Sequence, residues 1–351
     1  MGRTASVVEP EAGLPDGFAS EADLDEFMSR PSAALVHDLR AIEGDIAVVG
    51  VAGKMGPTLA RMAKRAAPDR RVFGVARFSE PGIARALEEA GVEPIRADLL
   101  DRAAVGALPR APNVIFMAGR KFGSLGGEDL TWAMNAYVPG IVAEHFTGSR
   151  IVAFSTICVY PFVPVAHGGS LEDDPLGPPG EYAMSCVGRE RIFRHFSEQT
   201  GSPGALVRLS YAIDMRYGVL HDLGKRLLAE EPIDLAMGHV NIIWQGDACS
   251  QALRLLRHCT VPSRPFNVSG PETASIRALA TALGRRLGRE PRFAGEEAPT
   301  AWLANTGLAE SLFGYPSVPV AKMVEWTADW LSRGMNSLGK ATHFEVRTGT
   351  Y

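Results

Sequence analysis

The sequence predicts an α/β protein whose parallel β-sheet is covered by helices on both faces. Short, largely apolar runs occur at residues 45–49, 71–76, 113–117 and 150–154, and segments with helical spacing of apolar residues separate them. Continuous apolar strands that alternate with helices are typical of parallel sheets buried on both sides. The 351 residues, 46% of them hydrophobic, suffice for one large domain or two smaller ones.

Composition and charge narrow the possible partners and location. The net charge of -4 gives no reason to expect a nucleic-acid or membrane-surface partner. No apolar run is long enough to span a bilayer, and the N-terminus lacks the pattern of a signal peptide. The four cysteines show no CxxC spacing, and we find no set of metal ligands. We therefore expect a cytoplasmic protein without a bound metal.

The N-terminal extension, residues 1–44, is expected to lie outside the main sheet. Residues 1–20 are predicted to form a loose arm. Between Glu21 and Ile42 the spacing of apolar residues predicts one or two helices, interrupted by Pro31, that pack on the outside of the domain.

A glycine turn follows the first strand. Gly50, Gly53 and Gly56 stand between the apolar run 45–49 and a segment of helical spacing. Glycines in this arrangement allow a sharp turn, close approach of a pyrophosphate and close packing of helix on strand. The N-terminus of the helix then offers free N–H groups and a positive dipole end to the anion. Many ordinary strand-to-helix turns also carry glycine, so the triplet alone leaves both possibilities open.

The end of the second strand bears on the choice of nucleotide. In a nucleotide-binding unit, an acidic residue at this place favours a free ribose 2′-hydroxyl and an arginine favours a 2′-phosphate. Here the strand 71–76 is followed by Arg77, with Ser79 close by. This indicates NADP, unless Arg77 is an ordinary exposed arginine.

The next elements continue the alternation. A helix through residues 83–90 precedes a strand at 92–95 and the pair Asp98-Leu99. The strand 113–117 ends in Ala118-Gly119, and a helix over about 130–146 carries Asn135. The strand 150–154 ends in Ser155-Thr156. After a Pro/Gly-rich segment, 161–180, a helix begins near Tyr182, and a further strand spans 205–209.

Beyond residue 210 the periodicity becomes irregular. Short strands at 233–235, 240–244 and 266–268 mix with helices at about 247–258, 275–287 and 319–333. We expect a main domain at 45–212 with returns near 239–270, and a smaller lobe at 213–335. The tail, 336–351, is apolar enough between 340 and 351 to dock.

These motifs together resemble the extended short-chain dehydrogenase/reductases, the NAD(P)-dependent sugar epimerase/dehydratase family, over about residues 45–335. The resemblance rests on the following motifs: a GxxGxxG turn (Gly50 to Gly56), an Asp-Leu pair (Asp98-Leu99), a small-residue pair (Ala118-Gly119), a helix asparagine (Asn135), a Ser/Thr strand motif (residues 154–160), the start of a YxxxK motif (Tyr182 to Ser185), and a late strand and turn (residues 266–270).

The resemblance implies a Rossmann-type doubly wound parallel sheet with a smaller C-terminal substrate-binding lobe, and NADP in preference to NAD as cofactor. It also implies a homodimer formed through the helices at 130–146 and 182–199. The residues implied in cofactor binding are Gly50, Ala52, Gly53, Lys54, Met55, Gly56, Arg77, Asp98, Leu99, Ala118, Gly119, Tyr182, Cys186 and Leu209.

The implied chemistry is hydride transfer, with Tyr182 as acid/base, Thr156 as the orienting hydroxyl and Ser155 assisting. Cys186, however, replaces the motif's lysine, and a neutral thiol cannot supply the positive charge that favours a phenolate. Three explanations stay open: Lys121 or its neighbour Arg120 supplies the charge, the oxidised nicotinamide's own charge suffices, or hydride chemistry has been lost. A nucleophilic role for Cys186 is disfavoured, because no histidine lies nearby in the sequence.

The substrate is expected to be a carbohydrate-like small molecule, a sugar or sugar acid. Nucleotide-sugar members of the family carry an arginine where this chain has Val240, and the loss of a diphosphate partner argues against a nucleotide-diphosphate sugar. Residues that could bind substrate are Arg120, Lys121, Arg216, Asn241 and Trp244. Arg216 could instead form a salt bridge, and Trp244 could belong to the core. The predicted function is an NAD(P)-dependent oxidoreductase or epimerase; the alternative is a catalytically impaired NAD(P)-binding sensor or scaffold.

Overall fold

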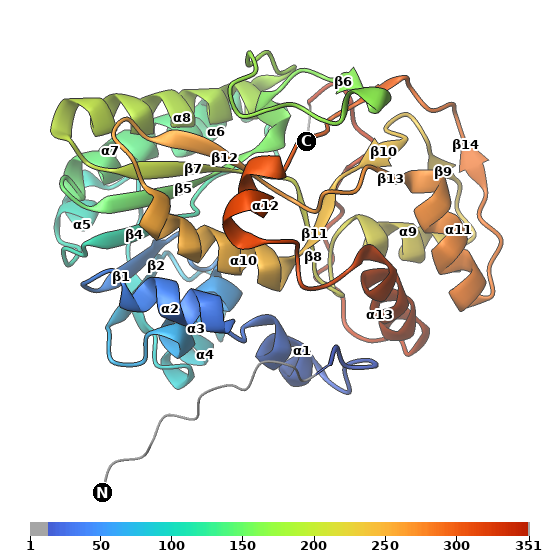
Figure 1. Cartoon of the computed structure of the whole chain (residues 1–351), viewed down its shortest axis with the longest axis horizontal. Coiled ribbons are helices and arrows are strands. Elements are labelled where there is room, and N and C mark those ends of the chain that lie inside the picture. The colour runs from blue at the N-terminus through green and yellow to red at the C-terminus, as the bar shows by residue number, and fades with distance from the viewer. Residues whose placement is uncertain (1–12, 350–351) are drawn as a thin grey trace, which may run out of the picture.

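The computed structural model describes residues 13–349 and shows a large and a small lobe side by side (Figure 1). The large lobe holds a seven-stranded parallel sheet of order β12-β7-β5-β4-β1-β2-β3. Its strands are β1 (Ile46–Val49), β2 (Val72–Ala76), β3 (Glu93–Arg96), β4 (Asn113–Phe116), β5 (Arg150–Thr156), β7 (Gly204–Leu209) and β12 (Arg264–Val268). The strand order reverses between β1 and β4, which is the switch point of a doubly wound sheet. The predicted fold class is confirmed.

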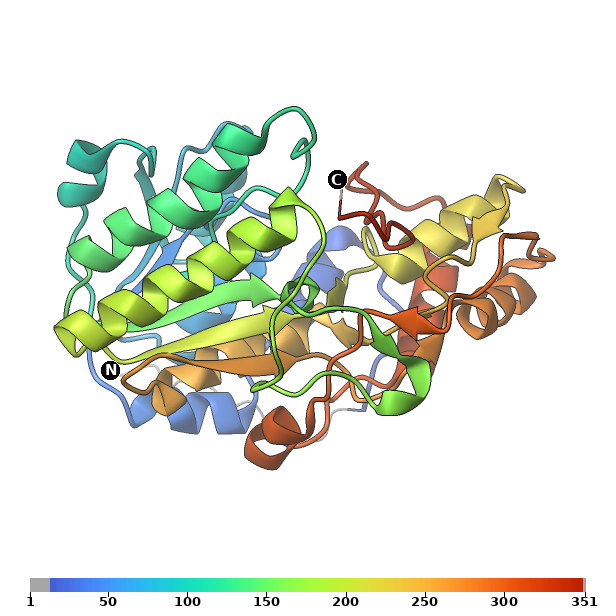
Figure 2. The ribbon, with the colours of Figure 1, turned by 90° about the horizontal axis from the view of Figure 1, so that it is seen from above.

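Helices cover both faces of this sheet. One face packs against α2, α3, α4 and α10 through a core that includes Leu39, Leu59 and Ala252. The other face packs against α5, α7 and α8, and Figure 2 shows α7 and α8 lying side by side across the strands. The bounds of these helices are α2 (Ala33–Arg40), α3 (Gly56–Ala66), α4 (Ile83–Glu89), α5 (Arg102–Gly106), α7 (Val138–His145), α8 (Glu181–Thr200) and α10 (Gln245–Arg254).

The small lobe packs three helices around short strand pairs, and it has its own core of Trp326, Trp330 and aliphatic residues. Its elements are α9 (Val219–Leu228), α11 (Ile276–Leu287), α13 (Val320–Ser332), β8 (Tyr211–Ile213), β9 (Ile233–Asp234), β10 (His239–Val240), β11 (Ile242–Trp244), β13 (Ala274–Ser275) and β14 (Phe293–Ala294). Connecting elements are β6 (Val163–Pro164), β15 (Thr300–Ala301) and α12 (Gly307–Phe313).

The helix expected over 130–146 is interrupted. It consists of α6 (Glu128–Trp132), a π-helical turn (Ala133–Tyr137) and α7. Pro139 has no N–H with which to bond the carbonyl four residues earlier, which is that of Asn135. A π turn inside a helix is frequent at functional sites. The turn frees the backbone of Asn135 for contacts with another helix.

The N-terminal extension differs from the expectation of a loose arm. Pro31 does separate two helices, α1 (Glu21–Met28) and α2. However, Phe18 is only 4% exposed and packs with Phe27 against Trp244 and Trp326 of the small lobe. The extension therefore bridges the lobes, because α1 joins the small-lobe core while α2 joins the sheet core. Residues 1–12 of the predicted arm lie outside the described residues.

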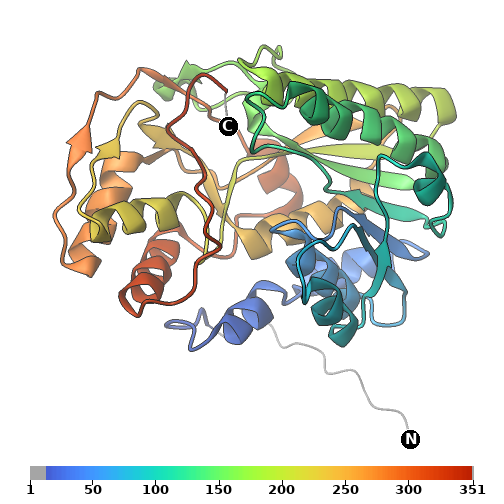
Figure 3. The ribbon, with the colours of Figure 1, turned by 180° about the vertical axis from the view of Figure 1, so that it is seen from behind.

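The C-terminal tail docks, as its apolar residues predict. It runs between the two lobes without helix or strand, and Figure 3 shows it rising from α13 past the open edge of the sheet. Phe344 anchors it with 2% exposure. Over residues 13–349, no helix has the length and apolar character needed to cross a membrane.

Candidate functional site

The glycine turn lies at the switch point between β1 and β4. Gly50 has a φ of +91°, which favours glycine, and a Cβ there would lie 2.5 Å from the amide nitrogen of Ala118. A Cβ on Gly56 would lie 2.1 Å from the carbonyl oxygen of Val51, so only glycine lets α3 start this close to the strand. At Gly53 the nearest atom to a Cβ is 3.5 Å away, and the residue is exposed. The turn thus presents an open backbone beside the N-terminus of α3, which suits a pyrophosphate.

Two arginines meet at the end of the second strand. Arg77 is exposed directly after β2, and Arg96 at the end of β3 donates from Nη1 to the carbonyl oxygen of Arg77 at 2.5 Å. Asp98 accepts from the amide of Leu100, and Leu99 is buried. Sequence reasoning passed over Arg96, although the parallel register that pairs Ala76 with Arg96 follows from the predicted β-α-β order. Two cationic side chains therefore lie together at the ends of β2 and β3.

The candidate acid/base stands at the start of α8. Tyr182 is half-buried, and Cys186 one turn later is fully buried. Burial raises the pKa of Tyr182 well above its usual value, and the nearby thiols of Cys186 and Cys158 act in the same direction. Burial also raises the pKa of Cys186 to about 11, so the thiol is neutral at physiological pH. Tyr182 therefore needs a cation if it is to accept a proton near neutrality.

The two hydroxyls after β5 have different roles. Ser155 donates to Oε1 of Glu190 at 2.6 Å, within a buried network that includes Arg208. Its hydroxyl is therefore committed to the helix that carries Tyr182. Thr156 accepts from the amide of Cys158 at 3.2 Å and still has a hydroxyl proton to donate. Thr156 is the better placed of the two to contact a substrate oxygen.

Lys121 lies in the loop that follows β4. Its ammonium donates to the carbonyl oxygen of Thr342 in the tail at 3.1 Å. Burial lowers its pKa, while Cys158, Asp222 and Cys186 act in the opposite direction. The lysine therefore shares its surroundings with the two thiols that flank Tyr182. Arg120 instead turns back onto its own loop, where Nη2 donates to the carbonyl oxygen of Gly123.

A second lysine joins the glycine turn to the small lobe. Lys54 donates to the carbonyl oxygen of Ala212 at 3.1 Å, and its Nζ lies 3.8 Å from the centroid of the Tyr217 ring. Burial lowers the pKa of Lys54 to about 8. The Lys54 side chain spans the two lobes. The predicted contact of Lys54 with the cofactor would therefore be made by its backbone.

Arg189 is a buried cation that sequence reasoning missed. Its guanidinium donates to the carbonyl oxygen of Phe154 at 2.8 Å and to Oδ1 of Asn135 at 2.6 Å. It stands one helical turn after Cys186, and its charge opposes the upward pKa shifts of Tyr182 and Cys186. A cation three positions from the missing lysine, on the same helix face, is a signal that the sequence contained.

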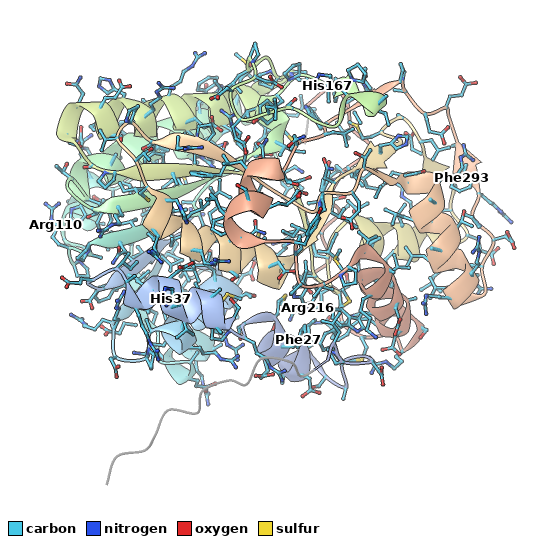
Figure 4. The ribbon with its side chains drawn as sticks, in the orientation of Figure 1. Phe27, His37, Arg110, His167, Arg216 and Phe293 are labelled. Atoms are coloured by element: carbon cyan, nitrogen blue, oxygen red, sulfur yellow. The ribbon has the colours of Figure 1, made fainter. Side chains whose placement is uncertain are left out.

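The structure places three predicted substrate residues in packing roles. Arg216 is 11% exposed and forms ion pairs with Asp214, Asp25 and Glu21; Figure 4 shows it above Phe27 of α1. Trp244 belongs to the aromatic cluster around Trp326. The amide of Asn241 is 1% exposed and bonds the backbone of Glu272 and Ala304. The polar groups of Arg216 and Asn241 are therefore engaged within the protein, and the Trp244 ring lies in the core.

The remaining predicted cofactor residues lie in the turn or at the carboxyl ends of strands. Met55 and Ala118 are buried, whereas Ala52 and Leu209 are half-buried. A Cβ at Gly119 would lie 2.4 Å from Nη2 of Arg189. Over residues 13–349 no group of three or more histidine, cysteine or acidic side chains could hold a metal ion.

The protein is therefore a doubly wound α/β protein with a glycine turn at the switch point of its sheet. The helix that carries Tyr182 begins at the same edge of the sheet. Residues 46–216 match the family model described as the NAD dependent epimerase/dehydratase family. The match covers the part of the chain that holds the glycine turn, Thr156 and Tyr182, and over that part the chain is similar to this family. A comparison with curated proteins gives no match.

Solved structures share the fold. UDP-glucuronic acid 4-epimerase from Bacillus cereus, solved with UDP-glucuronic acid and NAD, has a TM-score of 0.69 at 18% identity, covering 82% of this chain and 99% of that one. DesIV, a dTDP-glucose 4,6-dehydratase from Streptomyces venezuelae, has a TM-score of 0.70 at 19% identity over 82% and 97%. MoeE5, solved with UDP-glucose and NAD, has a TM-score of 0.67 at 19% identity over 83% and 99%. At these identities the likeness concerns the fold.

Proposed function

We propose that the protein is an NAD(P)-dependent oxidoreductase or epimerase that acts at a hydroxyl or carbonyl carbon of a sugar or sugar acid. The observation that carries this proposal is the convergence of the open glycine turn, Thr156 and Tyr182 at one edge of the sheet. These elements follow β1, follow β5 and begin α8. Ligands bind at this edge in open α/β sheets. The solved relatives with NAD in their titles support the same cofactor class.

In this proposal NAD(P), when bound, accepts or returns a hydride at the reacting carbon. Tyr182 accepts the proton of the substrate hydroxyl as the carbonyl forms and returns it in the reverse direction. Thr156 donates a hydrogen bond to the reacting oxygen. The backbone of Gly53 and the N-terminus of α3 hold the pyrophosphate. Val240 is fully buried, so no cation stands there for a substrate diphosphate; this favours a substrate without one.

We propose Lys121 as the cation that replaces the lysine absent at position 186. Removing the charge should make the phenolate of Tyr182 harder to form. The increase of kcat with pH should therefore occur at a higher pH. For Lys121→Ala we expect turnover at neutral pH to fall about tenfold or more. The measurement is the pH profile of kcat.

The matched comparison is Arg189→Met, which removes the buried cation of α8. If Lys121→Ala leaves the profile unchanged and Arg189→Met shifts it, then Arg189 supplies the charge and the assignment to Lys121 is wrong. Unchanged profiles in both variants would favour the charge of the oxidised nicotinamide itself.

The two arginines at the ribose end support a preference for NADP. Arg77→Ala should weaken NADPH binding about tenfold or more and leave NADH binding nearly unchanged, because only the 2′-phosphate loses a charged partner. Parallel calorimetric titrations of both nucleotides measure this difference. Arg102→Ala is a suitable control, since Arg102 pairs with Glu144 elsewhere on the surface. Equal loss for both nucleotides, or tighter binding of NADH by the native protein, would contradict the assignment.

A homodimer is also proposed, through the helical face of α6, α8 and the π turn. Large apolar side chains are exposed there: Leu130, Trp132, Tyr137 and Met184. Such a cluster is typical of protein–protein interfaces. Sedimentation should give twice the chain mass, and a Tyr137→Glu variant should sediment as a monomer; a monomeric native protein would contradict this proposal. Cytoplasmic location stays a proposal as well, supported by the four cysteines, which lie in the described part of the chain and form no disulfide there.

The alternative is a non-catalytic NAD(P)-binding sensor or scaffold. The neutral Cys186 favours it, whereas the half-buried Tyr182 at the sheet edge where β5 ends in Thr156 favours the enzyme. The Tyr182 substitution described in the Discussion separates the two.

A further inference from the structure

The tail segment 337–349 spans the open edge of the sheet, where the proposed cofactor site lies. It has no helix or strand of its own, yet Thr342 is 1% and Phe344 2% exposed. Its polar contacts reach positions far apart in the chain. Figure 3 shows it passing between the lobes. We call residues 337–349 the strap.

The strap contacts three elements of the proposed site. Lys340 lies 3.9 Å from Glu80, which follows Arg77 after β2. The carbonyl oxygen of Thr342 accepts from Lys121 in the loop after β4. Gly349 lies against Gly180, immediately before the helix of Tyr182. The strap thus crosses the ribose end, the loop after β4 and the start of the tyrosine helix.

Further anchors fasten the strap to the small lobe. Asp222 of α9 accepts from the amide and the hydroxyl of Thr342 at 2.7 and 2.6 Å, and Arg226 pairs with Glu345 at 3.0 Å. Arg347 donates to the carbonyl oxygen and hydroxyl of Thr300, both at 2.7 Å, and stacks on Phe162. Most of these contacts are side-chain hydrogen bonds, and each of them can break while the others remain.

The strap also borders a hollow at the surface. This hollow of about 310 Å³ lies between α9 and the strap, lined by Asp222, Arg226, Phe344 and Glu345 among others. The strap therefore packs less tightly against α9 at this place than a core segment would.

We propose that the strap is a gate: it closes the open edge of the sheet and must detach for the dinucleotide to enter and leave. This inference rests on the proposed function for the identity of the ligand. Local openings of this kind are governed by a few contacts, because an extended segment has no hydrogen-bond ladder of its own. A gate that does not contact the ligand speeds entry and exit equally and leaves the dissociation constant unchanged.

The test loosens the strap at two independent anchors. Arg347→Ala removes the contacts with Thr300 and Phe162, and Thr342→Val removes the hydroxyl bonded to Asp222 at nearly constant volume. The matched control is Arg292→Ala, a surface arginine of the small lobe whose side chain is 69% exposed. Stopped-flow measurements give the association and dissociation rate constants of NADPH. Loosening one charged anchor should raise both constants about tenfold while Kd changes less than about twofold.

Other outcomes overturn the gate. Rates equal to those of the control variant would show that the strap does not gate the cleft. A faster association with unchanged dissociation, and therefore tighter binding, would show that the strap occupies the nucleotide's own place. Hydrogen exchange without any ligand provides an independent measure: amides of residues 119–123 and 341–346 should exchange faster in both loosened variants. If NADPH does not bind but this exchange does increase, the proposed function fails while the opening of the strap stands; unchanged exchange overturns the gate itself.

Discussion

Tyr182→Phe should abolish turnover while NADPH binding stays nearly intact. The substitution removes only the hydroxyl oxygen that would exchange a proton with the substrate, and the ring keeps its packing at the start of α8. General acid–base catalysis by a positioned side chain contributes about 10²–10⁴-fold to rate, so kcat should fall by this order. The measurement pairs kcat on a panel of sugars and sugar acids with calorimetric titration of NADPH.

Tyr315→Phe is the matched control, because Tyr315 is 75% exposed; its activity should equal that of the native protein. Full activity in the Tyr182 variant would show that the proposed mechanism is wrong. If the native protein binds NADPH but turns over no sugar or sugar acid, with or without an attached nucleotide, the sensor or scaffold alternative gains support. Failure to bind either nucleotide would remove both proposals.

Arg208→Met should destabilise the protein by about 3–5 kcal/mol, because it leaves the carboxylate of Glu190 buried without its partner. Both side chains are 5% exposed, and Arg208 donates to Glu190 through Nε and Nη2 at 2.7 to 3.2 Å. The same guanidinium donates to the hydroxyl of Tyr160. Glu190 also accepts from Ser155, so the pair connects β5, β7 and α8. Urea unfolding measures the loss.

Arg71→Met provides the contrast. Arg71 pairs with Glu93 at 2.7 Å, but their side chains are 60% and 46% exposed. An exposed pair of this kind contributes little to stability, because water screens its charges. The double variant Arg208→Met with Glu190→Gln should recover part of the loss, because the buried charge is gone. If the Arg208 and Arg71 substitutions lower the free energy of unfolding equally, then the buried pair is no more important for stability than the exposed one.

Sequence patterns predicted most of the sheet. The apolar runs, their order and the helix on each face depend on burial, and burial leaves a local imprint in residue type and spacing. The predicted bounds of the edge strand were less accurate. The strand expected at 92–95 is β3 at Glu93–Arg96, because an edge strand is half-exposed and carries a weaker apolar signal. The helix expected at 247–258 begins at Gln245 and ends at Arg254 before a 3₁₀ turn.

The site was predictable where a single residue type is required by backbone geometry. Gly50 and Gly56 are required by a positive φ and by a close strand–helix contact, and both requirements can be read from the motif. The fates of Arg216 and Trp244 were not predictable in this way. Each meets partners from the N-terminal extension, such as Asp25 and Phe18, and no local pattern links those segments.

The sequence by itself determined the α/β class, the doubly wound order and the resemblance to the epimerase/dehydratase family, because strand burial and the glycine turn act over a few neighbouring residues. The tertiary structure alone decided the partners of the buried lysines and the path of the C-terminal tail. Lys121 meets Thr342 across 221 residues of chain, and Lys54 meets Ala212 across 158. Such contacts arise only when the lobes pack together, since electrostatic and hydrogen-bond partners are chosen by distance in space and not by spacing along the chain.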